Sequence, residues 1–99
     1  MSYLFHPAAE AEFEDAVDYY DESDEVLGDE FEMEVAATIG RIVSHPDAWQ
    51  SYSHRTRRCL CNRFPYSIIY RLVDDRAVIY AVMHQKRKPG YWKDRLKQL

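Results

Sequence analysis

Three short runs of β-forming residues in the second half of the chain constrain its fold more than any other feature. They cover residues 57–63, 66–73 and 77–83. Pro65 separates the first two runs and the Asp74-Asp75 pair separates the last two, so consecutive hairpins are the simplest connection. The third run is apolar on both faces of a strand, which indicates a central position in a sheet.

Two stretches in the first half repeat apolar residues at helical spacing. The first stripe consists of Ala9, Phe13, Ala16, Val17 and Tyr20, and the second of Leu27, Phe31, Val35, Ile39, Ile42 and Val43. Pro7 suits the first turn of a helix. The polar residues 21–25 interrupt the pattern, and Pro46 should end the second helix near His45. The sequence therefore predicts two amphipathic helices that form a hairpin.

A short β-type segment precedes the helices, and a segment without periodicity follows them. Residues 2–6 are expected to form a strand, and residues 46–56 a loop. The order is β-α-α-β-β-β with a short C-terminal turn or helix. We expect an α+β fold, in which an N-terminal strand and a helical hairpin pack on a small antiparallel sheet. A length of 99 residues fits one domain over residues 1–99.

The composition excludes several classes of protein. With 46% hydrophobic residues and only three glycines, the chain can build a core and is not disordered by composition. No apolar run approaches the roughly 20 residues that span a bilayer. The N-terminal residues lack the positive and apolar regions of a secretory signal. A cytoplasmic protein without membrane contact is expected.

The two cysteines, Cys59 and Cys61, lie two positions apart in a predicted strand. Their side chains would share a face but diverge along it, which disfavours a mutual disulfide and favours free thiols. A metal site would need His54 or His84 in addition, and the paired CxxC spacing typical of zinc sites is missing. We expect neither a metal nor another cofactor.

The charges are divided unevenly along the chain. Residues 1–50 carry fourteen acidic side chains and a single basic one, Arg41, whereas residues 51–99 carry twelve basic and three acidic side chains. The net charge of −4 therefore conceals a two-sided molecule. We expect the acidic charge on the outer faces of the helices and the basic charge on the side of the sheet.

Cationic and aromatic side chains gather directly after the third β-type run, where folding does not require so many of them. Such a cluster suits contact with an anionic partner. If that partner is RNA, cleavage through the 2′-hydroxyl needs a proton acceptor, a group that stabilises the phosphorane and a proton donor. His84 could exchange protons near neutral pH, Arg87 could bind phosphate, and Tyr91 could stack on a base or donate a proton. These three are the candidate catalytic residues. The candidate RNA- or target-binding residues are Arg57, Arg58, Arg63, Lys86, Lys88, Trp92 and Arg95.

Each candidate also has a purely structural interpretation. His84 could form a hydrogen bond with loop backbone at the end of its strand. Tyr91 and Trp92 could be core residues that hold a C-terminal turn. The run Lys86-Arg87-Lys88 could be a solvated edge, and Arg57 and Arg58 could pair with the acidic helix faces. The residues alone leave these alternatives open.

A series of short fragments runs through most of the chain in a recognisable order. The N-terminal part contains F-x-P-x-A at residues 5–9, the Tyr19-Tyr20 pair and LG-x-x-F at residues 27–31. The C-terminal part contains the Arg57-Arg58 pair, RFPY at residues 63–66, Tyr70 and A-V-x-H-x-x-R-x-P-x-Y-W at residues 81–92. Together they resemble the RelE/ParE superfamily of toxins from type II toxin–antitoxin modules.

The resemblance implies a growth-inhibiting toxin with a role in plasmid stabilisation. A cognate antitoxin encoded beside it would hold it inactive, in a toxin–antitoxin hetero-oligomer. ParE-like members bind DNA gyrase and have no known need for a catalytic residue. RelE-like members are ribosome-dependent endoribonucleases that cut mRNA, and a third alternative is an inactive member that only binds antitoxin. The acidity of the chain favours gyrase binding, whereas His84, Arg87 and Tyr91 favour RNA cleavage, so whether it is an enzyme stays open.

The antitoxin is expected to bind through a segment that is disordered when free. Such segments fold on binding and wrap large surfaces, and their Asp and Glu side chains can meet the basic side of the toxin. We expect the segment to lie against the toxin as a helix or an added strand.

Overall fold

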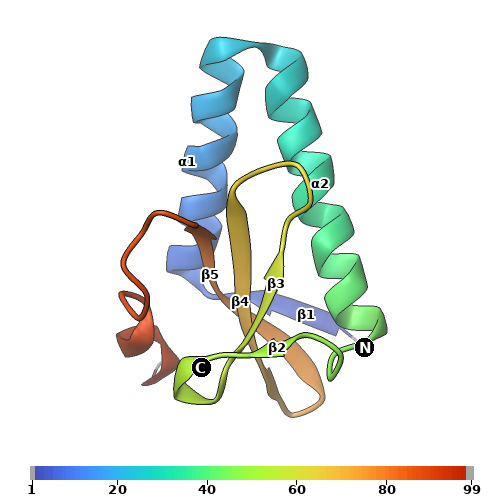
Figure 1. The fold of residues 1–99 in the computed structure, drawn as a ribbon, viewed down its shortest axis with the longest axis vertical. Helices are drawn as coiled ribbons and strands as arrows, with labels where there is room; N and C mark the ends of the chain where they lie inside the picture. Colours follow the sequence, from blue (N-terminus) through green and yellow to red (C-terminus); the bar gives the residue numbers. More distant parts are fainter. Residues whose placement is uncertain (1, 98–99) are drawn as a thin grey trace.

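The computed structural model describes residues 2–97, and Figure 1 shows the order of the elements. The strands are β1 (Ser2–Phe5), β2 (Gln50–Ser51), β3 (Arg57–Leu60), β4 (Tyr66–Val73) and β5 (Arg76–His84). The helices are α1 (Pro7–Ser23) and α2 (Glu25–Ser44), and 3₁₀ turns cover Ser53–Arg55 and Lys93–Lys97. The predicted α+β order is confirmed, with β2 as an additional short strand.

The two helices form a hairpin that extends well beyond the sheet (Figure 1). Helix α1 starts at Pro7, where Nδ1 of His6 accepts a hydrogen bond of 3.0 Å from the backbone N–H of Ala8. Asp24 alone joins the helices, and its Oδ1 caps α2 by accepting a bond of 2.9 Å from the N–H of Val26. The interruption is therefore shorter than the predicted residues 21–25, because residues 21–23 continue α1 and Glu25 already belongs to α2.

Within residues 2–97, five strands form one sheet in the order β1-β5-β4-β3-β2. Strand β5 lies between β1 and β4, which confirms its predicted central position. The turn between β4 and β5 places Asp74 and Asp75 at φ values of 51° and 61°. Aspartate tolerates this left-handed conformation better than most residues, which suits the pair to a tight hairpin.

The orientation of the first strand, which the sequence did not predict, makes the sheet mixed rather than purely antiparallel. Strand β1 runs parallel to β5, with Ser2 beside Arg76 and Phe5 beside Ile79, while β2, β3, β4 and β5 are antiparallel neighbours. Hairpins make antiparallel pairs, whereas β1 and β5 are joined through both helices and three other strands, which permits a parallel pair. The sheet is therefore mixed.

Two predicted boundaries near β3 also differ from the structure. The segment at residues 46–56, expected to be a loop, contains β2 and a 3₁₀ turn. The strand expected over residues 57–63 ends at Leu60, because the chain then turns back. In that turn the N–H of Cys61 donates to the carbonyl of Tyr66 at 2.9 Å.

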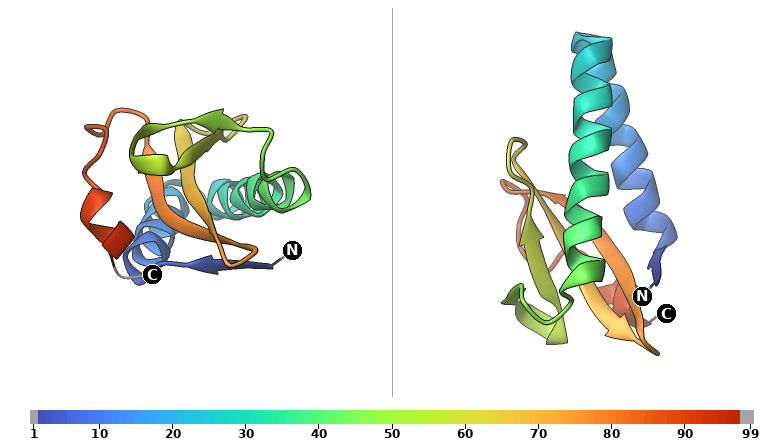
Figure 2. Two further views of the ribbon diagram at one scale, coloured as in Figure 1. Left: turned by 90° about the horizontal axis from the view of Figure 1, so that it is seen from below. Right: turned by 90° about the vertical axis from the view of Figure 1, so that its right-hand side faces the viewer.

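Hydrophobic side chains pack on both faces of the sheet. Figure 2 shows both helices on one side of it, where the larger core lies around Phe31, Val35 and Ile68. On the opposite face, Ile69, Ala81 and Met83 pack with Trp92 and with the partly buried Tyr52, Tyr91 and Leu96. Adjacent strand residues point to opposite faces, so Ile68 and Ile69 belong to different cores. The C-terminal segment therefore covers the face of the sheet that the helices leave free.

The two cysteines belong to the core between the helices and the sheet. Cys59 and Cys61 are free and buried, and the hydroxyl of Thr38 donates to Sγ of Cys61 at 3.5 Å. Burial raises the pKa of both thiols. Neutral, buried thiols of this kind are poor nucleophiles, so the pair contributes to packing and not to chemistry.

Candidate functional site

The three predicted catalytic residues, His84, Arg87 and Tyr91, line one cavity of about 240 Å³. The cavity lies between α1 and the segment that follows β5, and its other lining residues are Glu12, Asp15, Ala16, Tyr19, Tyr66 and Val82. The structure thus brings the predicted trio together. It also places two carboxylates beside them that the sequence interpretation did not include.

Glu12 is the centre of the polar contacts in this cavity. Its carboxylate accepts hydrogen bonds from the hydroxyl of Tyr91 at 2.7 Å and from Nη1 and Nη2 of Arg95 at 2.9 and 3.0 Å. A fourth bond of 3.1 Å comes from the backbone N–H of Val82. The side chains of Glu12 and Arg95 are only 18% and 19% exposed, so solvent screens this ion pair less than a surface pair.

The same contacts close the edge of β5. Strand β1 ends beside Ile79, and in residues 2–97 no strand continues along the rest of that edge. Nη1 of Arg95 donates to the carbonyl of Tyr80 at 2.9 Å, and Glu12 accepts from the N–H of Val82. Two side chains therefore satisfy backbone groups that a neighbouring strand would otherwise bind.

Tyr91 is held so that its phenol stays protonated. Burial raises the pKa of Tyr91, and its hydrogen bond to Glu12 raises that pKa further. Arg87 stacks on the ring, with the guanidinium carbon 4.0 Å from the ring centroid. A phenol whose pKa is raised and whose proton already bonds to a carboxylate is a poor proton donor for a substrate. In this arrangement Tyr91 holds the C-terminal segment against α1.

His84 is the last residue of β5 and contacts both backbone and an aromatic ring. Its Nδ1 accepts a hydrogen bond of 3.0 Å from the N–H of Lys86. Its ring meets that of Tyr66 edge-on at 5.1 Å, and burial raises the pKa of Tyr66 to about 12. The contact with Lys86 leaves Nε2 as the ring nitrogen that can exchange a proton with a ligand.

The predicted binding residues of β3 lie away from this cavity. Nη1 of Arg57 donates to the carbonyl of Trp49 at 2.8 Å, and Nη2 of Arg58 donates to Oε1 of Gln50 at 2.6 Å. Neither arginine lines the cavity that contains His84. The structure therefore separates the basic residues of β3 from the predicted catalytic trio.

Three further basic candidates, Arg63, Lys86 and Lys88, are exposed. Arg63 forms an ion pair of 2.8 Å with Glu30 of α2. The sequence had suggested such pairing with a helix face for Arg57 and Arg58. Lys86 and Lys88 are exposed in the segment after β5. The exposed ion pair between Arg63 and Glu30 contributes little to stability.

Two predicted binding residues occupy structural positions. Trp92 has no exposed surface, and its ring lies 6.1 Å from that of Tyr52 and 5.8 Å from that of His54. A buried indole cannot stack on a nucleic-acid base unless its segment moves, so the position of Trp92 agrees with the core interpretation. Arg95 is likewise occupied by Glu12 and by the carbonyl of Tyr80.

Glu12 is the residue that the sequence interpretation missed, although a signal was present. It lies three residues after Ala9 and four before Ala16, and both alanines are buried on the apolar stripe of α1. A carboxylate on a buried stripe needs a partner. No local pattern could have identified that partner, because Arg95 lies 83 positions away.

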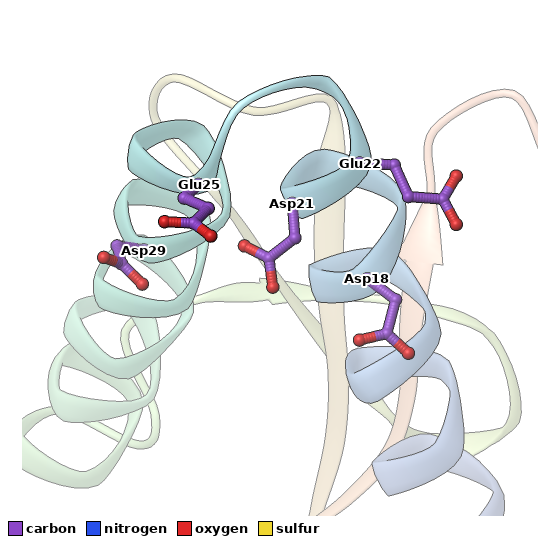
Figure 3. A pocket seen from close by; sticks show the side chains of 5 residues that line it. All are labelled: Asp18, Asp21, Glu22, Glu25 and Asp29. Carbon is purple, nitrogen blue, oxygen red and sulfur yellow. The ribbon is translucent and has the colours of Figure 1, made fainter.

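The tip of the helical hairpin forms a separate acidic cavity of about 500 Å³. Its lining residues are Asp18, Asp21, Glu22, Glu25 and Asp29, which Figure 3 shows in close-up. Asp21 points toward α2, and a Cβ atom at Gly28 would lie 1.6 Å from its Oδ1. Gly28 therefore leaves the space that the Asp21 side chain fills between the helices.

Neither a metal centre nor a membrane-spanning helix is found in the part of the chain that the structure describes. Within residues 2–97, no group of three or more His, Cys, Asp or Glu side chains is placed to hold a metal ion. No helix in that range is both long enough and apolar enough to cross a bilayer.

Raising the pH above 10 is expected to destabilise the fold, because four phenols, those of Tyr20, Tyr66, Tyr70 and Tyr91, bind their protons more tightly in the folded chain. Burial raises the pKa of Tyr66 and Tyr70 from 10.0 to about 12, and the pKa of Tyr91 is also raised. Above pH 10 the unfolded chain loses these protons first. The stabilisation from these groups is therefore complete below pH 10 and is lost as the pH rises toward the folded pKa values.

Urea unfolding at a series of pH values between about 8 and about 11.5 checks this expectation. Tyr70→Phe should flatten the decline, and Tyr3→Phe, at a residue that is 50% exposed, is the matched control. A free energy of unfolding that stays constant over the whole range would contradict the prediction.

Comparison with known proteins adds one family match. The family model described as the ParE toxin of the type II toxin–antitoxin system, parDE, matches residues 3–89. The matched range contains both helices and, except for Ser2 of β1, the strands of the sheet in Figure 1, and it ends before Tyr91. No curated protein matched the chain.

Proposed function

Because the chain belongs to the ParE toxin family of type II toxin–antitoxin systems, we propose that it arrests growth by binding DNA gyrase. A cognate antitoxin neutralises it. The observation that carries this proposal is the set of hydrogen bonds to Glu12, which engage Tyr91 and Arg95 in holding the C-terminal segment. Residues with that task are not free for catalysis.

The charge of the cavity also supports a binding protein over a ribonuclease. Glu12 and Asp15 line the same cavity as His84 and Arg87, so an RNA phosphate would approach two carboxylates there. Catalysis of phosphodiester cleavage requires positive charge where the negative charge develops. The positive charge of Arg95 is balanced by Glu12. A net charge of −4 further disfavours docking on ribosomal RNA.

We propose the acidic helical hairpin as the surface that contacts gyrase. Tyr19, Val26 and Met33 are 65%, 61% and 71% exposed on it, amid acidic side chains. Tyrosine and methionine are enriched at protein interfaces, and tyrosine supplies contact area at low entropic cost. This surface lies within the residues that the family model matches. It lies outside the cavity of His84, apart from Tyr19, which also lines that cavity.

The purified protein is expected to inhibit supercoiling of relaxed plasmid by gyrase, and production of the protein alone is expected to stop growth. Met33→Asp should weaken the inhibition at least about tenfold, which corresponds to about 1.4 kcal/mol of binding free energy. Arg87→Ala, in the cavity, is the control and should change it less than about twofold. Normal growth at verified soluble production would instead indicate an inactive member that only binds antitoxin.

Ribosome-dependent mRNA cleavage is the second candidate, because His84, Arg87 and Tyr91 do converge on one cavity. In that case Arg87→Ala should lower cleavage of translated mRNA at least tenfold, since a charge-assisted contact contributes about 1.5–3 kcal/mol. His84→Gln should lower it similarly without changing the melting temperature. Primer extension on translated mRNA, run beside the supercoiling assay, separates the two functions.

A further inference from the structure

A groove of about 420 Å³ lies between the second half of α2 and the end of β3, beside the short strand β2. Its lining residues are Arg41, Trp49, Gln50, Arg58, Leu60 and Asn62. The groove brings the single basic residue of the first half of the chain, Arg41, together with Arg58 from the basic half. None of its residues lines the cavity of His84 or the acidic cavity at the tip of the hairpin.

The two guanidinium groups of the groove are held in place without an acidic partner. Nη2 of Arg41 donates to Oγ1 of Thr38 at 3.1 Å and to the carbonyl of Leu60 at 3.4 Å. The guanidinium of Arg58 lies 4.7 Å from the ring centroid of Tyr52, and its Nη2 bonds to Gln50. Each guanidinium carries five N–H donors, so these contacts leave donors on both.

Three other arginines of this chain differ in this respect, whereas Arg55, Arg71, Arg76 and Arg87 also lack a carboxylate within 4.0 Å among residues 2–97. Arg57, Arg63 and Arg95 each have a carboxylate within 4.0 Å. Among residues 2–97, neither Arg41 nor Arg58 has one, and Nε of Arg58 is buried with no hydrogen-bond partner in that range. Two fixed positive charges with spare donors favour an occupant that carries carboxylates.

The groove also has an apolar floor and a backbone edge that is already satisfied. Leu60 is 49% exposed, and the indole of Trp49 is oriented by its hydrogen bond of 3.2 Å to the carbonyl of Arg41. The carbonyl of Leu60 accepts from Arg41, and the N–H of Asn62 donates to Oε2 of Glu34 at 2.6 Å. An added strand would find these groups occupied, so recognition here depends on side chains.

We propose that this groove binds an acidic segment of the antitoxin, with carboxylates on Arg41 and Arg58 and an apolar side chain between them on Trp49 and Leu60. The inference rests on the antitoxin of the proposed function. A segment that is disordered when free is rich in charged residues, and only acidic ones complement two unpaired guanidinium groups. The arginines supply specificity and the apolar floor supplies buried area.

Fluorescence anisotropy with the full-length protein tests the groove. The probes are overlapping peptides of about 15 residues that tile the protein encoded beside the toxin, a length that spans such a groove in extended form. Arg41→Gln and Arg58→Gln should each weaken binding of the acidic peptide at least about tenfold, because each removes a charge-assisted contact. Arg76→Gln, an exposed arginine at the start of β5, is the matched control and should change it less than about twofold.

Gln50→Glu provides a variant that keeps the fold. Its carboxylate would replace the amide that Arg58 contacts at 2.6 Å and would compete with the peptide, so binding should fall about tenfold with an unchanged melting temperature. Binding within about twofold of wild type in all three groove variants would overturn the proposal. So would equal competition from a single-stranded RNA oligonucleotide, which would identify a general anion site.

The outcome is independent of the gyrase assay. If supercoiling is unaffected but the groove variants lose the peptide, gyrase binding is wrong and the groove assignment holds. If the toxin inhibits gyrase and the groove variants bind the antitoxin peptide normally, gyrase binding holds and the groove assignment is wrong.

Discussion

Replacing Trp92 by alanine is expected to lower the free energy of unfolding by about 3–5 kcal/mol, as for other large residues removed from cores. Trp92 has no exposed surface and packs with Ile69, Ala81 and Met83 on the face of the sheet opposite the helices. That core is small, so few side chains can move into the space that the indole leaves. Urea unfolding followed by far-UV circular dichroism measures the effect.

Trp92→Phe is the matched control because it keeps an aromatic ring and removes the five-membered ring of the indole with its N–H. Nε1 of Trp92 is buried without a hydrogen-bond partner among residues 2–97, so losing this donor breaks no bond. We expect a loss of about 1–2 kcal/mol from the smaller volume alone. A loss below about 1 kcal/mol for the alanine variant would show that the C-terminal segment does not pack as described.

Replacing Glu12 by alanine is expected to cost about 3 kcal/mol, because it leaves the largely buried Arg95 without its counter-charge. Removing one partner of a buried pair costs about 3–5 kcal/mol, and the partial exposure of this pair places it at the lower end. The hydroxyl of Tyr91 and the N–H of Val82 lose their acceptor at the same time. Hydrogen exchange should show the segment from Tyr91 onward opening more readily.

Asp15→Ala, in the same cavity, is the control for this prediction and should change stability by less than about 0.5 kcal/mol. A double-mutant cycle with Arg95→Ala isolates the pairwise term, which should be at least about 1 kcal/mol. Equal effects of Glu12→Ala and Asp15→Ala would mean that Glu12 does not hold the segment. Gyrase inhibition that survives in Glu12→Ala at low temperature would agree with a structural role.

Most of the fold could be predicted from the sequence because its signals are local. The apolar stripes of residues 9–20 and 27–43 repeat at the spacing of a helix, and each stripe folds where it was predicted. Pro46 and the Asp74-Asp75 pair act on their own backbone, so they mark the end of α2 and the hairpin between β4 and β5. The apolar character of both faces of β5 indicated a central position, and the strand does lie between β1 and β4.

The candidate site was predictable only in part. His84, Arg87 and Tyr91 follow one another in a single segment after β5, and they do meet in one cavity. Their chemical roles depend on what approaches from elsewhere. Tyr91 otherwise suits proton transfer, but its hydrogen bond to Glu12 gives it a structural role.

The sequence by itself determined the elements, the family and the division of charge between the two halves, because periodicity, turn residues and composition are properties of neighbouring positions. Only the tertiary structure decided that β1 lies parallel to β5, that Trp92 is buried, that Glu12 meets Arg95, and that Arg41 and Arg58 share a groove. Each of these joins segments far apart in the chain. Such contacts depend on how whole elements pack, which no local pattern encodes.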